Sequence, residues 1–449
     1  MTDDMSSCSG VVPGRDDEYP DTPVVRIARR ARVASRALAA TDAEQRIAAL
    51  HAMAQALRDH APAILSANDE DMSAAIERGM DEPLQDRLKL DSARLSAIAD
   101  ALDAVADLPE VIGEVIEERT LYNRIELKRI RVPLGVVAMI YEARPNVTAD
   151  AAGLVLKTAN ACILRGGSAA ARTNEVMTGV LSEAAEASGM PKNCIQSVAG
   201  GHEATEELME LRGLVDVLIP RGGAGLIRNV VANAKVPVIE TGVGNCHVYV
   251  NESGALAQAV SIIMNAKTQR PGVCNAIESL LVDRSIAKGA LPPILYSLTG
   301  AGVRVHLDPA LYEDGVLDPD LAESIPDDRR ALIVPATEDD WGREYLDLEI
   351  SCKLVEDVQE AIDHINTYGT GHSECIIAED PEVCALFQQR VDAAVVYANA
   401  STRFTDGGEF GLGAEIGIST QKLHARGPMG LEALTSSKYV LTGEGQIRG

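Results

Sequence analysis

The sequence predicts an α/β protein built from two or three domains. Three observations support this fold class. The chain has 449 residues, which is too long for one small domain. From residue 136 onward short apolar runs alternate with helical stretches, and a second alternation of this kind starts near residue 255. Strands that alternate with helices over short connections form parallel sheets with helices on both faces.

The first part of the chain is predicted to be a tail followed by helices. Residues 1–21 are rich in Asp, Ser, Gly and Pro, which favours a disordered tail. Residues Thr41 to Glu44 resemble a capping box that opens a helix running toward His60. Further helical periodicity covers 62–78 and 91–106. Residues 123–132 then alternate polar and apolar side chains, which predicts an exposed strand.

A first parallel sheet is predicted next. Its expected strands are 136–140, 161–164, 194–198, 215–219 and 236–239. The helices that fit between these strands are 150–158, 169–188, 202–211 and 224–234. Ligands of such sheets bind at the carboxyl ends of the strands.

The second α/β run completes the predicted fold. Helices are expected at 255–269, 286–298 and 355–367. Strands are expected at 277–282, 303–306, 331–334 and 375–378, with a last strand at 438–442.

Composition and charge exclude several classes of protein. The formal net charge of −26 argues against nucleic acid or an anionic membrane as the main partner, because both repel such a surface. No stretch approaches the roughly 20 apolar residues that cross a bilayer. The start of the chain lacks the features of a secretion signal, so we expect a cytoplasmic protein.

The cysteines do not suggest disulfides or a metal site. The chain has eight of them, none forms a CxxC pair, and no metal is expected. Most are expected to be small buried side chains, and one could be a nucleophile. The eight are Cys8, Cys162, Cys194, Cys246, Cys274, Cys352, Cys375 and Cys384.

Cys274 has the sequence context of a nucleophile. It lies in NAKTQRPGVCNAIE, where Arg270-Pro271-Gly272 ends a helix and a strand follows, so the cysteine sits on a turn. Lys267 and Arg270 are close in sequence, and cations favour the thiolate form. The alternative is that Cys274 is one more buried cysteine, and these features alone do not decide between the two.

Four further segments carry candidate site residues. Asn146, in YEARPNVT, follows a strand and could donate to an oxyanion, although a helix cap is the more common local role for such a residue. Two strand–Gly-Gly–helix segments, ILRGG and IPRGG, could bind a nucleotide phosphate. Segments of this kind are more often ordinary turns between a strand and a helix. Glu240 follows a strand and precedes glycines in PVIETGVGNCHVYV.

Taken together and in this order, these segments resemble the aldehyde dehydrogenase superfamily. In that resemblance Asn146 matches the oxyanion asparagine, Arg165 the nucleotide-contacting lysine, Glu240 the start of the ELGG-type motif and Cys274 the catalytic cysteine. The stretches YEARPNVT, ILRGG, IPRGG, ETGVGNCHVYV, PGVCNA and HINTYGTGHSE are most similar to the branch that reduces L-glutamyl 5-phosphate. The resemblance covers the chain from about residue 22 to its end.

The resemblance implies a domain layout. It consists of a Rossmann-type NADPH-binding domain at 22–120 and 134–250, a catalytic domain at 251–425, and a β oligomerisation arm at 121–133 and 426–449. A homodimer or homotetramer is therefore expected, because an exposed strand edge is satisfied by a neighbouring subunit. Glutamate 5-kinase, which makes the substrate, is a possible partner.

The resemblance also implies site residues. Cys274 and Asn146 would be catalytic, with a thioester formed on the cysteine and reduced by NADPH. A serine in place of an acidic residue at position 168 favours NADPH over NADH, because a carboxylate would repel the 2′-phosphate. The expected cofactor-binding residues are Arg165, Gly166, Gly167, Ser168, Arg221, Gly222, Gly223, Glu240 and Glu344. The expected substrate-binding residues are Arg144, Lys267, Arg270, His372 and Arg403, with Ser373 as a possible addition.

Two other functions compete with this one. A hydrolytic aldehyde dehydrogenase would oxidise a free aldehyde, and Glu240 does not separate the two outcomes, since its role could be structural, cofactor-orienting or basic. A non-catalytic protein that keeps the fold is the second rival, and the presence of both Cys274 and Asn146 argues against it.

Overall fold

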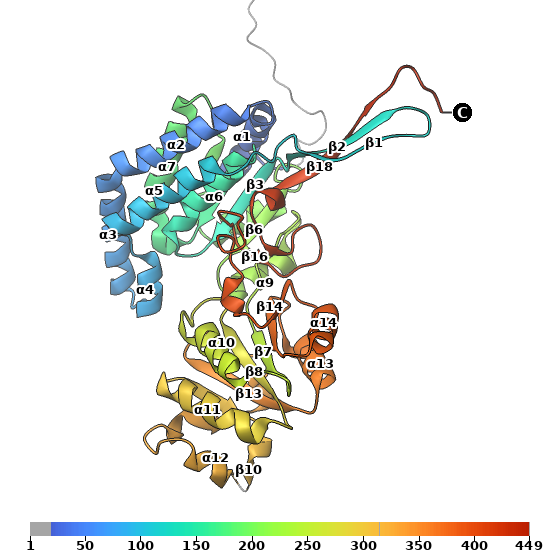
Figure 1. The fold of residues 1–449 in the computed structure, drawn as a ribbon. Helices are drawn as coiled ribbons and strands as arrows, with labels where there is room; N and C mark the ends of the chain where they lie inside the picture. Colours follow the sequence, from blue (N-terminus) through green and yellow to red (C-terminus); the bar gives the residue numbers. More distant parts are fainter. Residues whose placement is uncertain (1–18, 314, 449) are drawn as a thin grey trace, which may run out of the picture. The chain divides into compact units, whose positions relative to one another are not determined.

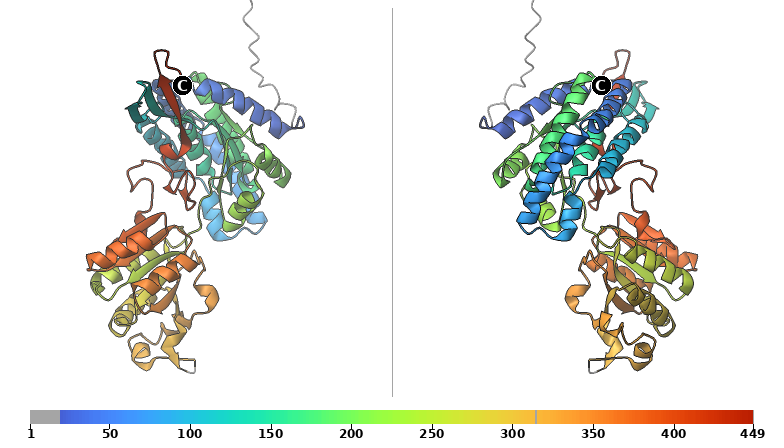
Figure 2. Two further views of the ribbon diagram at one scale, coloured as in Figure 1. Left: turned by 90° about the vertical axis from the view of Figure 1, so that its right-hand side faces the viewer. Right: turned by 90° about the vertical axis from the view of Figure 1, so that its left-hand side faces the viewer.

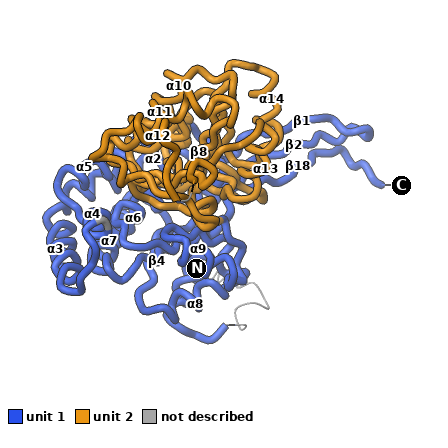
Figure 3. Tube along the Cα trace, turned by 90° about the horizontal axis from the view of Figure 1, so that it is seen from below, with its two compact units in different colours: residues 1–239, 430–449 blue, residues 240–429 orange. Residues whose placement is uncertain are grey.

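A computed structural model of the chain describes residues 19–313 and 315–448. Cys8 and residues 1–18 of the predicted tail lie outside the described residues. The chain divides into two units (Figure 3): unit 1 holds the residues up to 239 and those from 430 onward, and unit 2 holds residues 240–429. The chain returns to unit 1 because its last strand, β18 (Thr435–Thr442), pairs with β2 (Glu126–Pro133).

Unit 1 contains a parallel sheet of the predicted Rossmann type. Its strand order is β5-β4-β3-β6, and every pairing is parallel. The order reverses beside the first strand in sequence, as in dinucleotide-binding folds. The strands are β3 (Val136–Tyr141), β4 (Ala161–Gly166), β5 (Ile195–Ser197) and β6 (Val217–Arg221).

The helices of unit 1 form a layer against this sheet. Helices α2, α5, α6 and α7 pack on one another, and α6 also packs on β3 and β4 (Figure 1). The right-hand view of Figure 2 shows this helical layer face-on. The helices are α1 (Pro23–Leu38), α2 (Ala43–Asp59), α3 (Ala61–Glu77), α4 (Glu82–Leu88), α5 (Ser92–Asp107), α6 (Pro145–Lys157), α7 (Ala171–Ala187) after the 3-10 turn η1 (Ser168–Ala170), α8 (His202–Glu210) and α9 (Ala224–Asn233).

Two local predictions in unit 1 were wrong in detail. The capping box of α2 uses Asp42 and Gln45 instead of Thr41 and Glu44, because Asp42 accepts the Gln45 N–H and the Gln45 side chain accepts the Asp42 N–H. The predicted strand 236–239 makes only a single bridge, between Val238 and Leu218. An apolar run of four residues is too short a signal to separate a strand from an extended connection.

The predicted arm is a three-stranded antiparallel sheet that belongs to unit 1. The strand expected at 123–132 is β2, and the one expected at 438–442 is β18, which pairs with it. A further strand, β1 (Val115–Thr120), pairs with the other edge of β2 and was missed from sequence. After Thr435 the residues of β18 are exposed. Figure 3 shows β1, β2 and β18 projecting from the body of unit 1.

Unit 2 is built on a second parallel sheet, with strand order β12-β9-β13-β8-β7-β14-β15. Strand β7 lies between β8 and β14, so residues 240–250 belong to unit 2 and not to the cofactor domain in which the sequence placed them. The strands of this sheet are β7 (Cys246–Val250), β8 (Ile277–Asp283), β9 (Arg304–Leu307), β12 (Ile333–Pro335), β13 (Glu349–Val355), β14 (Ser373–Ile377) and β15 (Val395–Ala398).

Helices and short elements surround the second sheet. The helices are α10 (Leu256–Thr268), α11 (Ala287–Gly300), α12 (Pro319–Glu323), α13 (Val358–Tyr368) and α14 (Pro381–Arg390). The small strand pairs are β10 (Tyr312–Glu313) with β11 (Val316–Leu317), and β16 (Ile418–Ser419) with β17 (Gly427–Pro428). The 3-10 turns outside η1 are η2 (Pro309–Leu311), η3 (Arg330–Leu332), η4 (Glu338–Asp340), η5 (Thr402–Phe404) and, in unit 1, η6 (Leu431–Leu434).

Side chains that alternate between the two faces of the second sheet form a hydrophobic core on each face. Val248 and Leu280 belong to one buried cluster, with residues of α10 and α11. Their neighbours Tyr249 and Leu281 belong to the other, with residues of α13 and α14. Successive side chains of a strand point to opposite faces, so a strand that is buried on both sides is apolar throughout. Within the described ranges, no helix combines the length and apolar character needed to span a membrane.

Candidate active site

Exposure separates Cys274 from most other cysteines of the described chain. Cys274 and Cys384 are partly exposed, whereas Cys162, Cys194, Cys246, Cys352 and Cys375 are buried. Burial raises the pKa of Cys194 and of Cys375 to about 12. It also raises the pKa values of Cys162, Cys246, Cys352 and, to a smaller extent, Cys384. These thiols stay protonated near pH 7, and thiols react as thiolates.

The loop that carries Cys274 is held on both sides. It connects α10 to β8, as the sequence predicted. The Cys246 Sγ donates to the Cys274 carbonyl oxygen at 3.2 Å. Gly244 packs so closely that a Cβ atom there would lie 1.5 Å from the same oxygen. On the other side Thr402 donates to the Asn275 carbonyl oxygen at 2.7 Å. The position of Cys274 is therefore set by two separate segments.

Two of the predicted substrate-binding cations lie around this thiol. Arg270 is exposed, and the Arg403 Nε donates to the Gln269 side chain at 3.1 Å. Burial lowers the pKa of Arg403, the charge of Arg270 lowers it further, and Cys274 acts in the opposite direction. Arg403 is thus within electrostatic reach of both Arg270 and Cys274. Cations so placed favour a thiolate and attract a phosphate.

Two other predicted substrate-binding residues are placed differently. Lys267 is fully buried, and its Nζ donates to Glu278 at 2.6 Å. Burial lowers the pKa of Lys267 and raises that of Glu278 to about 7. His372 is also fully buried, with its Nδ1 2.8 Å from the Ser373 Oγ. Lys267 and His372 thus differ from Arg270, because neither side chain is exposed to solvent in this structure.

The two predicted cofactor glutamates both lie in unit 2. The Glu344 Oε1 accepts the Gly244 N–H at 2.6 Å, so this carboxylate supports the segment that presses on Cys274. Burial raises the pKa of Glu344. Glu240 is partly exposed, and its backbone N–H donates to the Gln421 side chain at 3.1 Å.

The residues around Cys274 lie at the amino ends of the second sheet. Gly244 precedes β7, Cys274 precedes β8 and Glu344 precedes β13, and these strands are parallel. This group therefore lies at the opposite ends of its strands from the carboxyl ends, where the sequence analysis expected ligands. The placement follows from the connections, because each of these residues sits in a loop that leads into its strand.

Asn146 lies in unit 1, in the first turn of α6. The helix begins at Pro145, its N-cap residue is Arg144, and no side chain caps it. The cap interpretation of Asn146 is therefore wrong. The side chain is exposed, and its Nδ2 donates to the Asp150 Oδ2 at 3.0 Å. Burial raises the pKa of Asp150 to about 6, against the effects of the Asn146 bond and the Arg221 charge.

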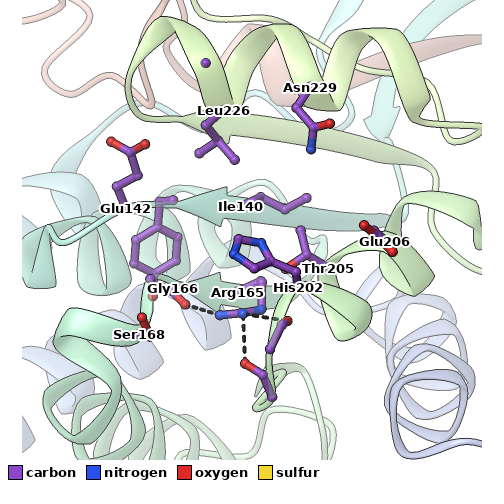
Figure 4. A pocket seen from close by; sticks show the side chains of 15 residues that line it. Ile140, Glu142, Arg165, Gly166, Ser168, His202, Thr205, Glu206, Leu226 and Asn229 are labelled. Atoms are coloured by element: carbon purple, nitrogen blue, oxygen red, sulfur yellow. Dashed lines mark hydrogen bonds between the residues drawn. The ribbon is translucent and has the colours of Figure 1, made fainter.

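A pocket of about 490 Å³ lies at the carboxyl ends of β3, β4 and β5 (Figure 4). Four predicted cofactor-binding residues line it. Arg165 Nη2 donates to the carbonyl oxygens of Gly200 and Gly201 at 2.9 and 3.0 Å. The four predicted residues are Arg165, Gly166, Gly167 and Ser168. The residues that sequence reasoning missed are Ile140, Tyr141, Glu142, Gly200, Gly201, His202, Thr205, Glu206, Gly225, Leu226 and Asn229.

A repeated signal in the sequence would have found more of this pocket. Three strands in succession are followed by a Gly-Gly pair, although only the first and third pairs were identified. The second glycine of each pair, Gly167, Gly201 or Gly223, is the N-cap of a helix or 3-10 turn, and no side chain caps it. Free backbone N–H groups at helix starts are suited to phosphate oxygens.

The third Gly-Gly pair is occupied by a side chain of the protein. The Glu142 Oε2 accepts the Gly223 N–H at 3.0 Å, and a Cβ atom on Gly222 would lie 2.6 Å from the Glu142 carboxyl carbon. The Arg221 carbonyl oxygen accepts the Glu142 N–H at 3.1 Å. Arg221, Gly222 and Gly223 are thus held beside the pocket by Glu142, which itself lines it.

Comparison with known proteins agrees with this architecture. Residues 15–308 match the aldehyde dehydrogenase family model. A gamma-glutamyl phosphate reductase of Thermobifida fusca is 50% identical over 428 residues, covering 95% of this chain and 98% of that protein. One from Moorella thermoacetica is 51% identical over 425 residues, covering 94% and 97%.

Solved structures give the same result. The crystal structure of a gamma-glutamyl phosphate reductase from Thermotoga maritima superimposes with a TM-score of 0.90 at 43% identity, covering 95% of this chain and all of that one. An acetylating aldehyde dehydrogenase from Geobacillus thermoglucosidasius, 23% identical with a TM-score of 0.66, shares the fold. The sequence motifs, the two parallel sheets and these matches lead to one conclusion: the chain belongs to the aldehyde dehydrogenase family.

Proposed function

We propose that the chain reduces L-glutamyl 5-phosphate to L-glutamate 5-semialdehyde and phosphate with NADPH, in proline biosynthesis. One observation carries the proposal: Cys274 is a partly exposed thiol on a doubly held loop, four positions after Arg270 and within electrostatic reach of Arg403. Two relatives that are 50% and 51% identical in sequence are gamma-glutamyl phosphate reductases, which supports the choice of substrate.

The thiol and the two arginines suit an acyl phosphate. Arg270 and Arg403 favour the thiolate of Cys274 and attract the phosphate group. The Cys274 Sγ attacks the acyl carbon, the bond from that carbon to the phosphate oxygen breaks, and a thioester remains on the protein. Phosphate leaves without a strong acid catalyst, since it is a stable anion near pH 7.

The Asn146 amide and the Cys274 backbone N–H are proposed to hold the oxyanion that forms during this attack. Asn146 is exposed in the first turn of α6, so its amide can reach a ligand. One such donor lowers the activation free energy of acyl transfer by about 3–4 kcal/mol.

The pocket of unit 1 suits NADPH. Arg165 lines this pocket, and its guanidinium is anchored to the carbonyl oxygens of Gly200 and Gly201. Arg165 and Ser168 would hold the 2′-phosphate, and the Gly-Gly turns allow a dinucleotide to approach the backbone. NADPH, when bound, supplies a hydride to the thioester carbon. The carbon–sulfur bond then breaks, which releases the aldehyde and restores the Cys274 thiolate.

Further parts of the proposal concern binding and assembly. Arg144, at the N-cap of α6, is a candidate for the substrate α-carboxylate. The exposed strands of the arm are proposed to pair with a second copy of the chain, giving a dimer or tetramer. We propose a cytoplasmic location and glutamate 5-kinase as the source of the substrate.

The decisive experiment replaces the nucleophile. Cys274→Ala should abolish NADPH oxidation with L-glutamyl 5-phosphate, whereas Cys384→Ala, at the other partly exposed cysteine, should leave it unchanged. Mass spectrometry of the wild type, quenched with substrate but no NADPH, should detect a glutamyl group on Cys274. Full turnover by Cys274→Ala would refute the covalent mechanism.

A second measurement separates this activity from a hydrolytic aldehyde dehydrogenase. Oxidation of L-glutamate 5-semialdehyde with NADP⁺ should require inorganic phosphate, because phosphate must attack the thioester to reverse the reaction. Oxidation at the same rate without phosphate would support the hydrolytic alternative.

A further inference from the structure

Asn146 is bonded to a carboxylate on its own helix. Asn146 and Asp150 are four residues apart on α6, where side chains at this spacing lie next to each other. The Nδ2–Oδ2 distance is 3.0 Å. Asp150 is partly buried, whereas Asn146 is exposed, so the carboxylate lies on the protein side of the amide.

An ionised carboxylate allows only one orientation of this amide. The carboxylate offers acceptors and no donor, so it can face the Asn146 NH₂ group but not its carbonyl oxygen. The NH₂ group has two hydrogens. One hydrogen bonds to Asp150, and the other stays available to a ligand. Because of the bond to Asp150, the amide nitrogen and oxygen of Asn146 can no longer exchange places.

We propose that Asp150 is a positioning residue that fixes the Asn146 amide with its NH₂ group ready to bind the oxyanion of the substrate. The inference rests on the proposed function, because it needs Asn146 to be the oxyanion donor. Without Asp150 the amide would rotate freely and spend part of its time with the carbonyl oxygen toward the oxyanion, which repels it.

The proposal leads to a pH dependence. Burial raises the pKa of Asp150 to about 6, while the Asn146 bond and the charge of Arg221, at the end of β6, favour the ionised form. Protonated Asp150 can donate to the Asn146 Oδ1, which permits the wrong orientation. The turnover number of the wild type should therefore fall as the pH drops through about 6.

The test compares Asp150→Ala, Asp150→Asn and Asn146→Ala. Asp150→Ala should lower kcat by about 10- to 100-fold, since small misplacements of a catalytic group have effects of this size, with little change in KM. Asp150→Asn keeps an acceptor but does not titrate, so it should lose the fall in kcat near pH 6. Gln55 and Asp59 of α2 form a matching amide–carboxylate pair at 2.8 Å, and Asp59→Ala should leave kcat unchanged.

Double substitution separates positioning from a general structural effect. Asp150→Ala should cause no further loss in the Asn146→Ala background, because the group that it positions is absent. The inference would be overturned if the losses in kcat of the two single variants add in the double variant. It would also be overturned if kcat of Asp150→Asn falls near pH 6 as it does in the wild type. If Asp150→Ala does not fold, the pH dependence of kcat in Asp150→Asn is sufficient to test whether Asp150 positions Asn146. Full activity of Asn146→Ala would instead refute the oxyanion role within the proposed function.

Discussion

At the scale of single residues, burial decides which chemistry a side chain can perform. Lys267 and Arg270 are three positions apart, and both precede Cys274 in the same short stretch of sequence. Lys267 lies on the buried face of α10 and pairs with Glu278, whereas Arg270 follows the end of the helix and is exposed. A buried ion pair of this kind costs several kcal/mol to break, because it leaves a charge without a partner. Only Arg270 remains available to a ligand.

His364 shows how burial makes stability depend on pH. The ring is 5% exposed, lies 5.9 Å from the Trp341 ring, and has no partner for its Nε2 among the described residues. Burial and the charges of His247 and Lys353 lower its pKa to about 3. Between the unfolded pKa of about 6.5 and this value, the unfolded chain binds a proton that the folded chain does not. Acid therefore destabilises the fold within that window.

We predict that His364→Phe removes part of this acid sensitivity. The wild type should lose about 2 kcal/mol through His364 between pH 7 and pH 5, at about 1.4 kcal/mol per pH unit below 6.5. Phenylalanine keeps the ring contacts and does not titrate. The chain has one tryptophan, Trp341, so its fluorescence during urea unfolding reports on this site. Equal losses in both proteins would contradict the prediction.

At the scale of elements, the loops that lead into strands position candidate site residues, as do the loops that follow strands. Gly244 shows how the position of the Cys274 loop depends on one small residue. It precedes β7, and its backbone packs against the Cys274 carbonyl oxygen, while Glu344 accepts its N–H. No side chain fits in this space, so glycine is required here for close approach and not for backbone conformation.

We predict that Gly244→Ala lowers kcat by about 100-fold or more, because the Cys274 loop must move to admit a methyl group. The same variant should change the rate at which Cys274 reacts with iodoacetamide. Gly289→Ala is the matched control: it lies in α11 with nothing within 4 Å of the added Cβ. It should raise stability by up to about 1 kcal/mol through helix propensity without altering turnover. Wild-type kinetics for Gly244→Ala would refute the packing argument.

Elements with strong periodicity could be predicted from sequence, and short or unusual ones could not. The helices at 62–78 and 91–106 appear as α3 and α5, shifted by one residue at each end. Strands β7, β13 and β15 were missed, because periodicity alone does not separate a short apolar strand from a loop or a helical segment. The capping box of α2 moved by one residue, since Asp42 and Gln45 compete with Thr41 and Glu44 for the same role.

At the scale of the whole molecule, the two units divide the proposed work. Unit 1 contains the pocket that two Gly-Gly turns line, and unit 2 contains the Cys274 thiol together with Arg270 and Arg403. The net charge of −26 repels anions from most of the surface, so an anionic ligand depends on local cations of this kind for its binding.

We predict that NADPH protects unit 1 from hydrogen exchange at defined loops. At 100 times its Kd a ligand stabilises the bound state by about 2.7 kcal/mol. The amides of 165–168 and 200–206 should therefore exchange more slowly, while those of β8 and β13, in the core of unit 2, should not change. Arg165→Ala should weaken the protection. Unchanged exchange at these loops of unit 1 would exclude the pocket as the cofactor site.

The sequence by itself determined the fold class, the order of the motifs and the candidates Cys274 and Asn146, because periodicity and local chemistry are written along the chain. Only the tertiary structure decided which predicted cations are exposed, that three Gly-Gly turns lie at one sheet edge, that residues 240–250 belong to unit 2 and that Asp150 bonds to Asn146. These outcomes depend on burial and on pairing between distant segments. Neither can be read from neighbouring residues, since both arise when the chain closes on itself.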